Sequence, residues 1–350
     1  MITRQLNNVN RLIDWTDEIN NIDSSFGFIV NSGLFNDKTT SQDAIMFEKS
    51  DYNTVLARTT SRRERNTQKQ GARTSKMYAL ALPYVNVQDK VVREDLQGYV
   101  QRGTEMTPET EGAVIAEKME KMRLTYDQTR EFMALSAVKG MSVDADGNVI
   151  ADMFDQFGLT QEVITWTLSD PNFDVIKACR ELKTKLTKDL RTGGTIRAIE
   201  VMVGVEFFDA LVAHPQVVAA HYAYAMPERA FYMDGGATYQ QFGVQNVFVF
   251  QGITFMTYDA TFSIDQGDGT FDVVDAVDPE EGHTIVRGVN DLFRVYYGTN
   301  NKLSGVNQQG APVYMHSYRD GRDYGIDLEM EFSHLYFGTQ PQTQKKLVLA

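Results

Sequence analysis

The chain has 350 residues, of which 42% are hydrophobic and 23% charged, and its formal net charge at pH 7 is −13. This hydrophobic fraction is typical of a globular protein, and the negative charge argues against non-specific binding of the whole molecule to nucleic acid. The single cysteine, Cys179, excludes an internal disulfide framework and is typical of a reducing cytoplasm. We expect neither a membrane span nor a signal peptide, because no apolar run is long enough and the first residues are polar.

The first 42 residues are rich in asparagine, aspartate and serine. Few apolar positions recur at a regular period, so the sequence predicts an arm rather than a packed element. The segment FGFIVNSGLF, residues 26–35, is the exception because it is apolar enough to dock onto another surface.

Residues 43–90 predict two long strands joined by a polar tip. AIMFEKSDYNTVLA and KMYALALPYVNV alternate apolar and polar side chains near the period of two that strands require. The tip, residues 62–76, has six basic side chains against one acid. These basic residues are Arg62, Arg63, Arg65, Lys69, Arg73 and Lys76. A two-stranded ribbon is only marginally stable alone in water, so we expect it to lie on another surface.

The basic tip has three interpretations. Because the rest of the chain is acidic, a second copy of the chain is a complementary partner. A nucleic-acid contact through phosphates is an alternative, although the tip has no aromatic residue for base stacking. A solvated loop with no partner is the third.

The sequence predicts its longest helix at residues 107–140. Thr107 is suited to the N-cap, Pro108 to the first helical position, and Gly140 to the stop. The helix would be roughly 48 Å long at about 1.5 Å per residue. Apolar side chains recur at a spacing of three and four, which predicts a single packing stripe. The stripe includes Ile115, Met119, Met122, Tyr126 and Met133.

The segment VDADGNVIADMF, residues 143–154, begins like a calcium-binding loop. Neither possible register places glycine and a glutamate where an EF-hand requires them. Asp146-Gly147 instead predicts a type I′ turn between two short strands.

The rest of the chain alternates short helices and strands, which indicates a mixed α+β protein. We expect a helix from Asp174 to Lys188 and two short helices separated by Pro215. Paired strands are expected on either side of residues 251–252 and 320–321.

No catalytic or metal-binding motif is recognisable. The histidines form no HExxH motif, and the sequence contains no Walker loop, GxSxG elbow or GxGxxG fingerprint. Cys179 is interpreted as a small buried hydrophobic residue. Glu329 and Glu331 share one face of an expected strand, as a glycosidase pair would, but strand alternation alone also explains this. We interpret them as solvated surface or subunit contacts, and we expect no cofactor and no metal.

Several stretches together resemble the lambda-type major capsid proteins of tailed bacteriophages, the major capsid protein E family. They are PYVNVQDKVVREDLQGYVQRG, SAVKGMSVDADGNVIADMFDQFGL, GVEFFDALVAHPQV, FQGITFMTYDA and HTIVRGVNDLFRVYYGTNNKLSGVNQQGAPVYM. The resemblance runs in the same order from about residue 50 to the C-terminus.

The resemblance implies an α+β protein with the Hong Kong 97 type capsid fold. The implied parts are an N-terminal arm at 1–42, an extended loop at 43–88, a peripheral domain at 89–164 with a spine helix at 107–140, an axial domain at 165–310, and return strands of the peripheral domain at 311–350. The tip would then lie over a neighbouring subunit.

The implied function is structural rather than enzymatic. Such proteins assemble as hexamers and pentamers into an icosahedral shell around phage DNA, in the host bacterial cytoplasm. The implied partners are further copies of the chain, a scaffolding protein, a portal, a decoration protein in some phages, and packaged DNA held by weak proximity, but no membrane. The alternatives are a cytoplasmic enzyme with an unrecognised site in residues 163–314, and a DNA-binding protein that acts through residues 62–76.

Overall fold

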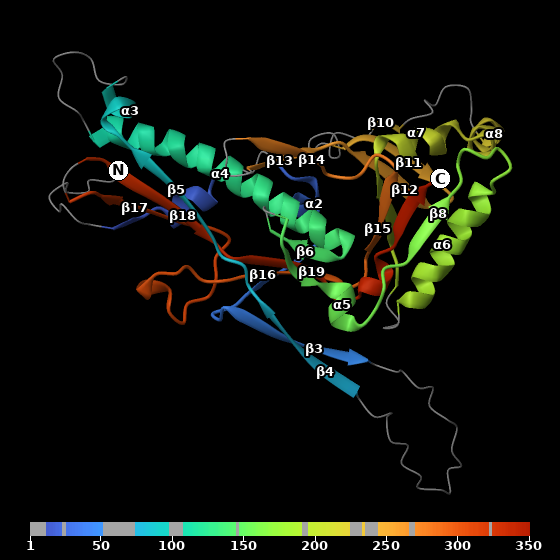
Figure 1. Cartoon of the computed structure of the whole chain (residues 1–350), viewed down its shortest axis with the longest axis horizontal. Coiled ribbons are helices and arrows are strands. Elements are labelled where there is room, and N and C mark those ends of the chain that lie inside the picture. Colours follow the sequence, from blue (N-terminus) through green and yellow to red (C-terminus); the bar gives the residue numbers. More distant parts are fainter. Residues whose placement is uncertain are drawn as a thin grey trace, which may run out of the picture. The chain divides into compact units, whose positions relative to one another are not determined.

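The computed structural model describes residues 12–22, 26–51, 74–97, 108–144, 147–190, 195–224, 233–234, 244–265, 270–321 and 324–350. The protein combines helices and strands, and after residue 224 the described elements are strands apart from two short 3-10 helices (Figure 1). The chain divides into two compact units. Unit 1 lies within Met1–Ala44, Ala81–Ala134 and Val295–Tyr336, and unit 2 within Ile45–Leu80, Leu135–Arg294 and Phe337–Ala350.

Unit 1 is built on a four-stranded antiparallel sheet. Its strands, in order, are β1 (Ile13–Asp14), β17 (Tyr314–Arg319), β18 (Ile326–Phe332) and β5 (Val85–Val91). The long helix α4 (Pro108–Lys139) and the short helix α1 (Thr16–Asn20) contribute to one hydrophobic core with this sheet. Alternate residues of β18, including Leu328, Met330 and Phe332, supply the sheet's share of the core.

Helix α4 confirms the predicted long helix. Pro108 is its first residue, which suits proline because the first N–H of a helix has no intrahelical partner. Gly140 ends the helix with a φ of +102°, where a side chain would be strained. A Cβ there would also approach the Phe154 ring to 2.1 Å. Thr107, the predicted N-cap, lies outside the described residues.

Among the described residues of the first 42, the expectation that residues outside 26–35 do not pack is wrong at Ile19, whereas the apolar segment 26–35 packs as its composition suggested. Ile19 of α1 is fully buried, and so are Phe28 and Ile29 of α2 (Phe28–Asn31). Strand β2 (Asn36–Thr39) joins a three-stranded sheet in the order β19 (His334–Gly338), β16 (Phe293–Tyr297), β2. Ile19, Phe28 and Ile29 are too few and too irregularly spaced to show a period in the sequence, yet all three side chains are buried in the fold.

Unit 2 contains a seven-stranded mixed sheet (Figure 1). Its order is β10 (Met233–Asp234), β11 (Val244–Phe250), β12 (Ile253–Tyr258), β9 (Ala198–Val203), β15 (Glu281–Arg287), β20 (Lys346–Leu349) and β8 (Val163–Trp166). The β12–β9 and β20–β8 pairs are parallel, and the others are antiparallel. Trp166 is buried with its ring 5.8 Å from Phe207 and 6.1 Å from Phe255.

Three helices of unit 2 agree with the sequence prediction. Helix α6 (Val175–Asp189) starts where Asp174 accepts a hydrogen bond from the backbone N–H of Lys177, at 3.0 Å. Helices α7 (Val205–Ala213) and α8 (Pro215–Tyr224) are separated at His214, directly before the proline that was expected to part them. The residue before a proline is disfavoured in the helical conformation, which explains the break.

The predicted hairpins are also present. Strands β11 and β12 meet at Gln251 and Gly252, which both have positive φ, +50° and +74°. Strands β6 (Met141–Val143) and β7 (Val149–Asp152) form the small hairpin that was preferred over a calcium loop, with Gly147 at a φ of +81°. Asp146 lies outside the described residues. Helix α5 (Met153–Phe157) follows directly.

The predicted ribbon is present within the described residues, which exclude residues 52–73. Strand β3 (Ala44–Asp51) pairs with β4 (Thr74–Ala81). The expected return strand is interrupted at Pro83, and the chain continues as β5, which pairs with β18 instead. Proline has no backbone N–H to donate to the hydrogen bonds between two strands, so Pro83 is a suitable place for the pairing with β3 to end and the pairing with β18 to begin. The sequence reasoning did not predict β16, β19, or the pair β13 (Thr261–Asp265) and β14 (Phe271–Asp275).

The two units divide the chain differently from the domain borders that the resemblance implies. The last strand, β20, pairs with β15 and β8, so it shares a sheet with β9. Residues 346–349 therefore lie with the middle of the chain, whereas β17 and β18 lie in unit 1. Within the described ranges, no helix is long and apolar enough to cross a membrane.

Candidate functional site

The basic tip, predicted as an inter-subunit contact, lies almost wholly outside the described residues. The residues outside are Arg62, Arg63, Arg65, Lys69 and Arg73. Lys76 is the third residue of β4. The contact role of this tip stays a prediction.

The ribbon that leads to the tip has one covered face and one exposed face. Ile45 on β3 and Leu80 on β4 are buried. Met46 and Met77 are 72% and 69% exposed. The alternation expected along β4 is therefore correct, and the ribbon presents methionine side chains to its surroundings at the base of the tip.

The five predicted packing residues of the long helix are all buried. They are Ile115, Met119, Met122, Tyr126 and Met133. The first four lie in the core that α4 shares with β5, β17 and β18. Tyr126 packs edge-on against Phe332, with ring centroids 5.1 Å apart, and burial raises the pKa of its hydroxyl far above the usual range. The stripe is therefore a packing face within unit 1.

Sequence reasoning missed three charged residues that lie buried on the same helix. The Nε atom of Arg123 lies 3.3 Å from a carboxylate oxygen of Asp127. The guanidinium of Arg123 also donates a hydrogen bond to the carbonyl of Ile19 at 3.0 Å. Glu131, one turn further, accepts hydrogen bonds from the backbone N–H groups of Ile29 and Val30, at 2.7 and 3.1 Å. The four-residue spacing of these charges beside the apolar stripe was the available signal. Together they attach the N-terminal segment to α4.

The pair of strand acids is buried, contrary to the interpretation that it is solvated. Glu329 and Glu331 are only 9% and 1% exposed, and the ammonium group of Lys302 contacts both carboxylates. Asn86 donates to Glu329 at 2.8 Å, and the backbone N–H of Asn301 donates to Glu331 at 2.8 Å. The sheet face is covered by the loop that contains Lys302, so period-two alternation placed the acids correctly but could not reveal their burial.

This cluster does not have the electrostatics of a glycosidase pair. Burial raises the pKa of Glu329, but hydrogen bonds from Lys302 and Asn86 outweigh it and hold the pKa below its usual value. A glycosidase general acid requires a raised pKa so that it stays protonated at working pH. The arrangement instead holds the loop at Lys302 against β18.

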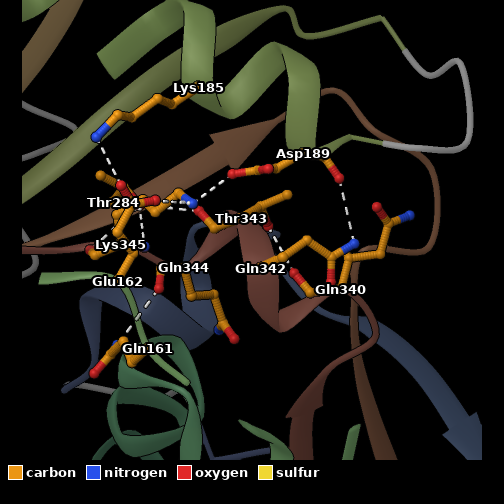
Figure 2. A network of polar contacts seen from close by, with 10 residues as sticks. All are labelled: Gln161, Glu162, Lys185, Asp189, Thr284, Gln340, Gln342, Thr343, Gln344 and Lys345. Carbon is orange, nitrogen blue, oxygen red and sulfur yellow. Dashed lines mark hydrogen bonds and ion pairs between the residues drawn. The ribbon is translucent and has the colours of Figure 1, made fainter. Parts of the chain in front are cut away.

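A second polar network, in unit 2, binds the last residues of the chain (Figure 2). The buried ammonium group of Lys345 contacts the carboxylates of Glu162, at 2.6 Å, and Asp189. Lys185 of α6 reaches the same Glu162 at 2.6 Å. Hydrogen bonds from Lys185 and Lys345 hold the pKa of Glu162 below its usual value. Two cations and two carboxylates thus neutralise one another at this site.

Glutamine side chains extend this network to the end of α4. Gln344 donates to the carbonyls of Ala137 and Val138 at 2.7 and 3.1 Å, and Gln161 donates to that of Lys139 at 2.9 Å. The last carbonyls of a helix have no intrahelical partner, so these side chains complete the helix end. No sequence signal identified this role, because Gln344 lies 206 or 207 residues from the carbonyls it contacts and Gln161 lies 22 residues from Lys139.

The described part of the chain offers little catalytic chemistry. Cys179 is buried, and desolvation raises its pKa to about 12, so it remains a thiol at neutral pH. No cluster of three metal-ligating side chains occurs among the described residues. Asp144 accepts hydrogen bonds from the backbone and side chain of Asn148 at 2.8 and 3.2 Å, which stabilises the β6–β7 turn.

A family model for phage major capsid protein E matches residues 14–348. The chain belongs to this family. A major capsid protein of Salmonella phage Felix O1 is 29% identical over 345 residues, covering 95% of this chain and 94% of that protein. A major capsid protein of Pseudomonas phage KPP10 is 23% identical over 342 residues, covering 94% of each.

Solved structures with the same fold have much lower sequence identity. The crystal structure of a putative capsid protein of a prophage of E. coli CFT073 has a TM-score of 0.60 at 13% identity, covering 97% of this chain and 100% of the other. The mature capsid of bacteriophage PhiM1 has a TM-score of 0.51 at 13% identity, covering 94% and 90%. The expected α+β fold of the Hong Kong 97 type is confirmed. The enzyme alternative in residues 163–314 receives no support.

Proposed function

We propose that this chain is the major head protein of a tailed phage and assembles as hexamers and pentamers into an icosahedral shell that encloses phage DNA. The observation that carries the proposal is the family match over residues 14–348, shared with relatives named as major capsid proteins over 94% of their length. Its role is structural, without catalytic turnover, and it resides in the virion capsid after assembly in the host bacterial cytoplasm.

The domain borders expected from the sequence form part of this proposal. Residues 1–42 would act as the N-terminal arm, 43–88 as the extended loop, 89–164 and 311–350 as the peripheral domain, and 165–310 as the axial domain. The exposed Met46 and Met77 support the assignment of the ribbon as a contact element, because exposed apolar side chains on a two-stranded ribbon require cover. The tip at residues 62–76 would lie over a neighbouring subunit.

The proposed partners follow from assembly and charge. Further copies of the chain are the main partner, with a scaffolding protein, a portal and, in some heads, a decoration protein as transient or accessory partners. A net charge of −13 supports a lining that holds DNA by weak proximity, since like charges prevent tight binding to phosphates.

The test is electron microscopy of the expressed chain, alone and with any scaffolding protein encoded beside it, after size fractionation. We expect shells, tubes or rings of subunits. A monodisperse monomer under both conditions would contradict the proposal. Charge reversal at Arg62, Arg63 and Arg65 is expected to block assembly while the circular dichroism spectrum and unfolding midpoint of the monomer stay unchanged.

A further inference from the structure

His283 of β15 is a buried side chain whose ring nitrogens are not satisfied. It is 5% exposed, and neither ring nitrogen has a hydrogen-bond partner among the described residues. A carboxylate oxygen of Glu281 lies 3.7 Å from Nε2, which is too long for a hydrogen bond. Buried polar groups in proteins are normally paired, so an imidazole in this state calls for an explanation beyond packing.

The ring lies on a charged face of the sheet where β15 meets β20. Lys346, the first residue of β20, is the cross-strand partner of His283. Glu281 is two residues before His283 on β15, so it shares the same face, and its carboxylate contacts the ammonium group of Lys346. On the other side of β15, the cross-strand partner of His283 is Met202 of β9, which is uncharged.

The charges around this ring favour a neutral imidazole. Lys139, the last residue of α4, adds a second ammonium group, which interacts with Glu281, Lys346 and Asp278. Burial lowers the pKa of His283, and the ammonium groups of Lys139 and Lys346 lower it further against the opposing attraction of Glu281. Protonation of the ring would therefore place a third cation beside two others at a buried site.

Strand β20 is the element that this repulsion would displace. Among the described strands, β8 pairs only with β20, so β8 joins the seven-stranded sheet through it. Leu347 of β20 is fully buried, and the backbone N–H of Ala350 donates to the carbonyl of Trp166 on β8 at 3.0 Å. Release of β20 would open the sheet beyond β15 and leave β8 without its strand partner, while β9, β12 and β11 remain paired with one another.

We infer that His283 makes β20 an acid-released latch of unit 2: the neutral ring lets β20 close the sheet between β15 and β8, and protonation of the ring expels β20. The contact between Lys346 and Glu281 holds the latch closed at neutral pH. The latch belongs to a single subunit, so it does not depend on assembly into a shell.

The direction of the response follows from where the proton binds. In the open state the ring is in water and binds a proton below about pH 6.5, whereas the closed state resists protonation. Acid therefore favours the open state. Between pH 7.5 and 5.0 the equilibrium constant for opening should rise by up to roughly 30-fold, the ratio of proton binding by a free imidazole at the two pH values.

Hydrogen exchange of the full chain, followed by mass spectrometry at pH 7.5 and 5.0, tests the inference. The rate of each segment is divided by that of an unstructured peptide of the same sequence at the same pH, which removes the intrinsic pH dependence of exchange. We expect the protection of residues 346–349 and 163–166 to fall at least tenfold at pH 5.0. Residues 254–257 of β12 should then remain at least tenfold better protected than β20. No fall at β20, or equal protection of β12 and β20, would overturn the inference.

Two matched variants assign the response to one ring. Glutamine cannot be protonated, so His283→Gln should reduce the fall at β20 to less than threefold. His334 is also buried but lies in unit 1, so His334→Gln should leave the fall at β20 unchanged. A full response in His283→Gln would overturn the inference. So would an equal reduction in both variants, because it would mean that β20 opens only when the whole chain unfolds. If His283→Gln does not fold, the comparison of β12 with β20 in the native chain still decides.

Discussion

Glu131, on the long helix α4, accepts a hydrogen bond from the backbone N–H of Ile29 at 2.7 Å, across 102 residues of sequence. A second bond from Val30 makes this carboxylate the cap of the short helix α2. Gly27, just before that helix, has a φ of +112°, and a Cβ there would approach Glu131 to 2.9 Å. The N-terminal segment is thus fixed to α4 by one buried carboxylate and one position without a side chain.

Replacing Glu131 with alanine should lower the free energy of unfolding by roughly 2–4 kcal/mol. The change leaves two backbone N–H groups, at least one of them buried, without an acceptor and removes a charge-assisted pair of hydrogen bonds. Urea unfolding followed by circular dichroism gives the value. Glu120→Ala, at an exposed position of the same helix, should change it by less than about 0.5 kcal/mol. Equal effects of the two substitutions would show that the cap does not matter.

Lys345→Met should be destabilising, by roughly 1–2 kcal/mol, since it removes the buried cation that the carboxylates of Glu162 and Asp189 share, although both carboxylates are partly exposed and solvent screens their repulsion. Thermal unfolding measures the loss. Hydrogen exchange should show faster opening of β20, which begins at the next residue. The triple variant with Glu162→Gln and Asp189→Asn should recover much of the stability, because the unpaired charges are gone. A triple variant no more stable than Lys345→Met would contradict this account.

His334 should make unit 1 less stable in acid. Burial lowers its pKa to about 3, so the folded state keeps the ring neutral while the unfolded chain binds a proton below about pH 6.5. The contribution of His334 to the free energy of unfolding is therefore fully present above about pH 6.5. It decreases as the pH drops towards 3, by up to about 1.4 kcal/mol per pH unit.

The measurement is a series of urea unfolding curves between pH 7.5 and 4.5 for the native chain and for His334→Gln. The slope of stability against pH should be shallower in the variant, although His283, whose pKa burial also lowers, retains its own contribution. Parallel slopes would show that His334 is already protonated in the folded protein.

Cys179 provides a probe of unit 2 that needs no substitution. Its thiol is buried and its pKa is raised to about 12, so a disulfide reagent at pH 8 should react on the order of 100-fold more slowly with the folded chain than with the urea-unfolded chain. The absorbance of the released thiolate gives both rates. Comparable rates in the two states would mean that α6 opens readily from the sheet.

The sequence alone determined several local elements of this protein. Pro108 and Gly140 delimit α4, Asp174 caps the start of α6, and Gln251-Gly252 forms the turn between β11 and β12. Each of these features depends on backbone preferences within a few residues, so it can be predicted locally. The order of recognisable segments also indicated the family, which the match over residues 14–348 shows.

Only the tertiary structure decided which side chains are buried and which strands pair. From the sequence, Glu331 is interpreted as a solvated or subunit-contact acid, and Glu131 is not singled out. They are 1% and 0% exposed, because Lys302 and the N–H groups of α2 come from distant segments and pair with them. Strand β20 pairs with β8 and β15 across more than 50 residues of chain. Period and propensity describe the backbone near a residue, whereas burial and pairing depend on what the rest of the chain places against it.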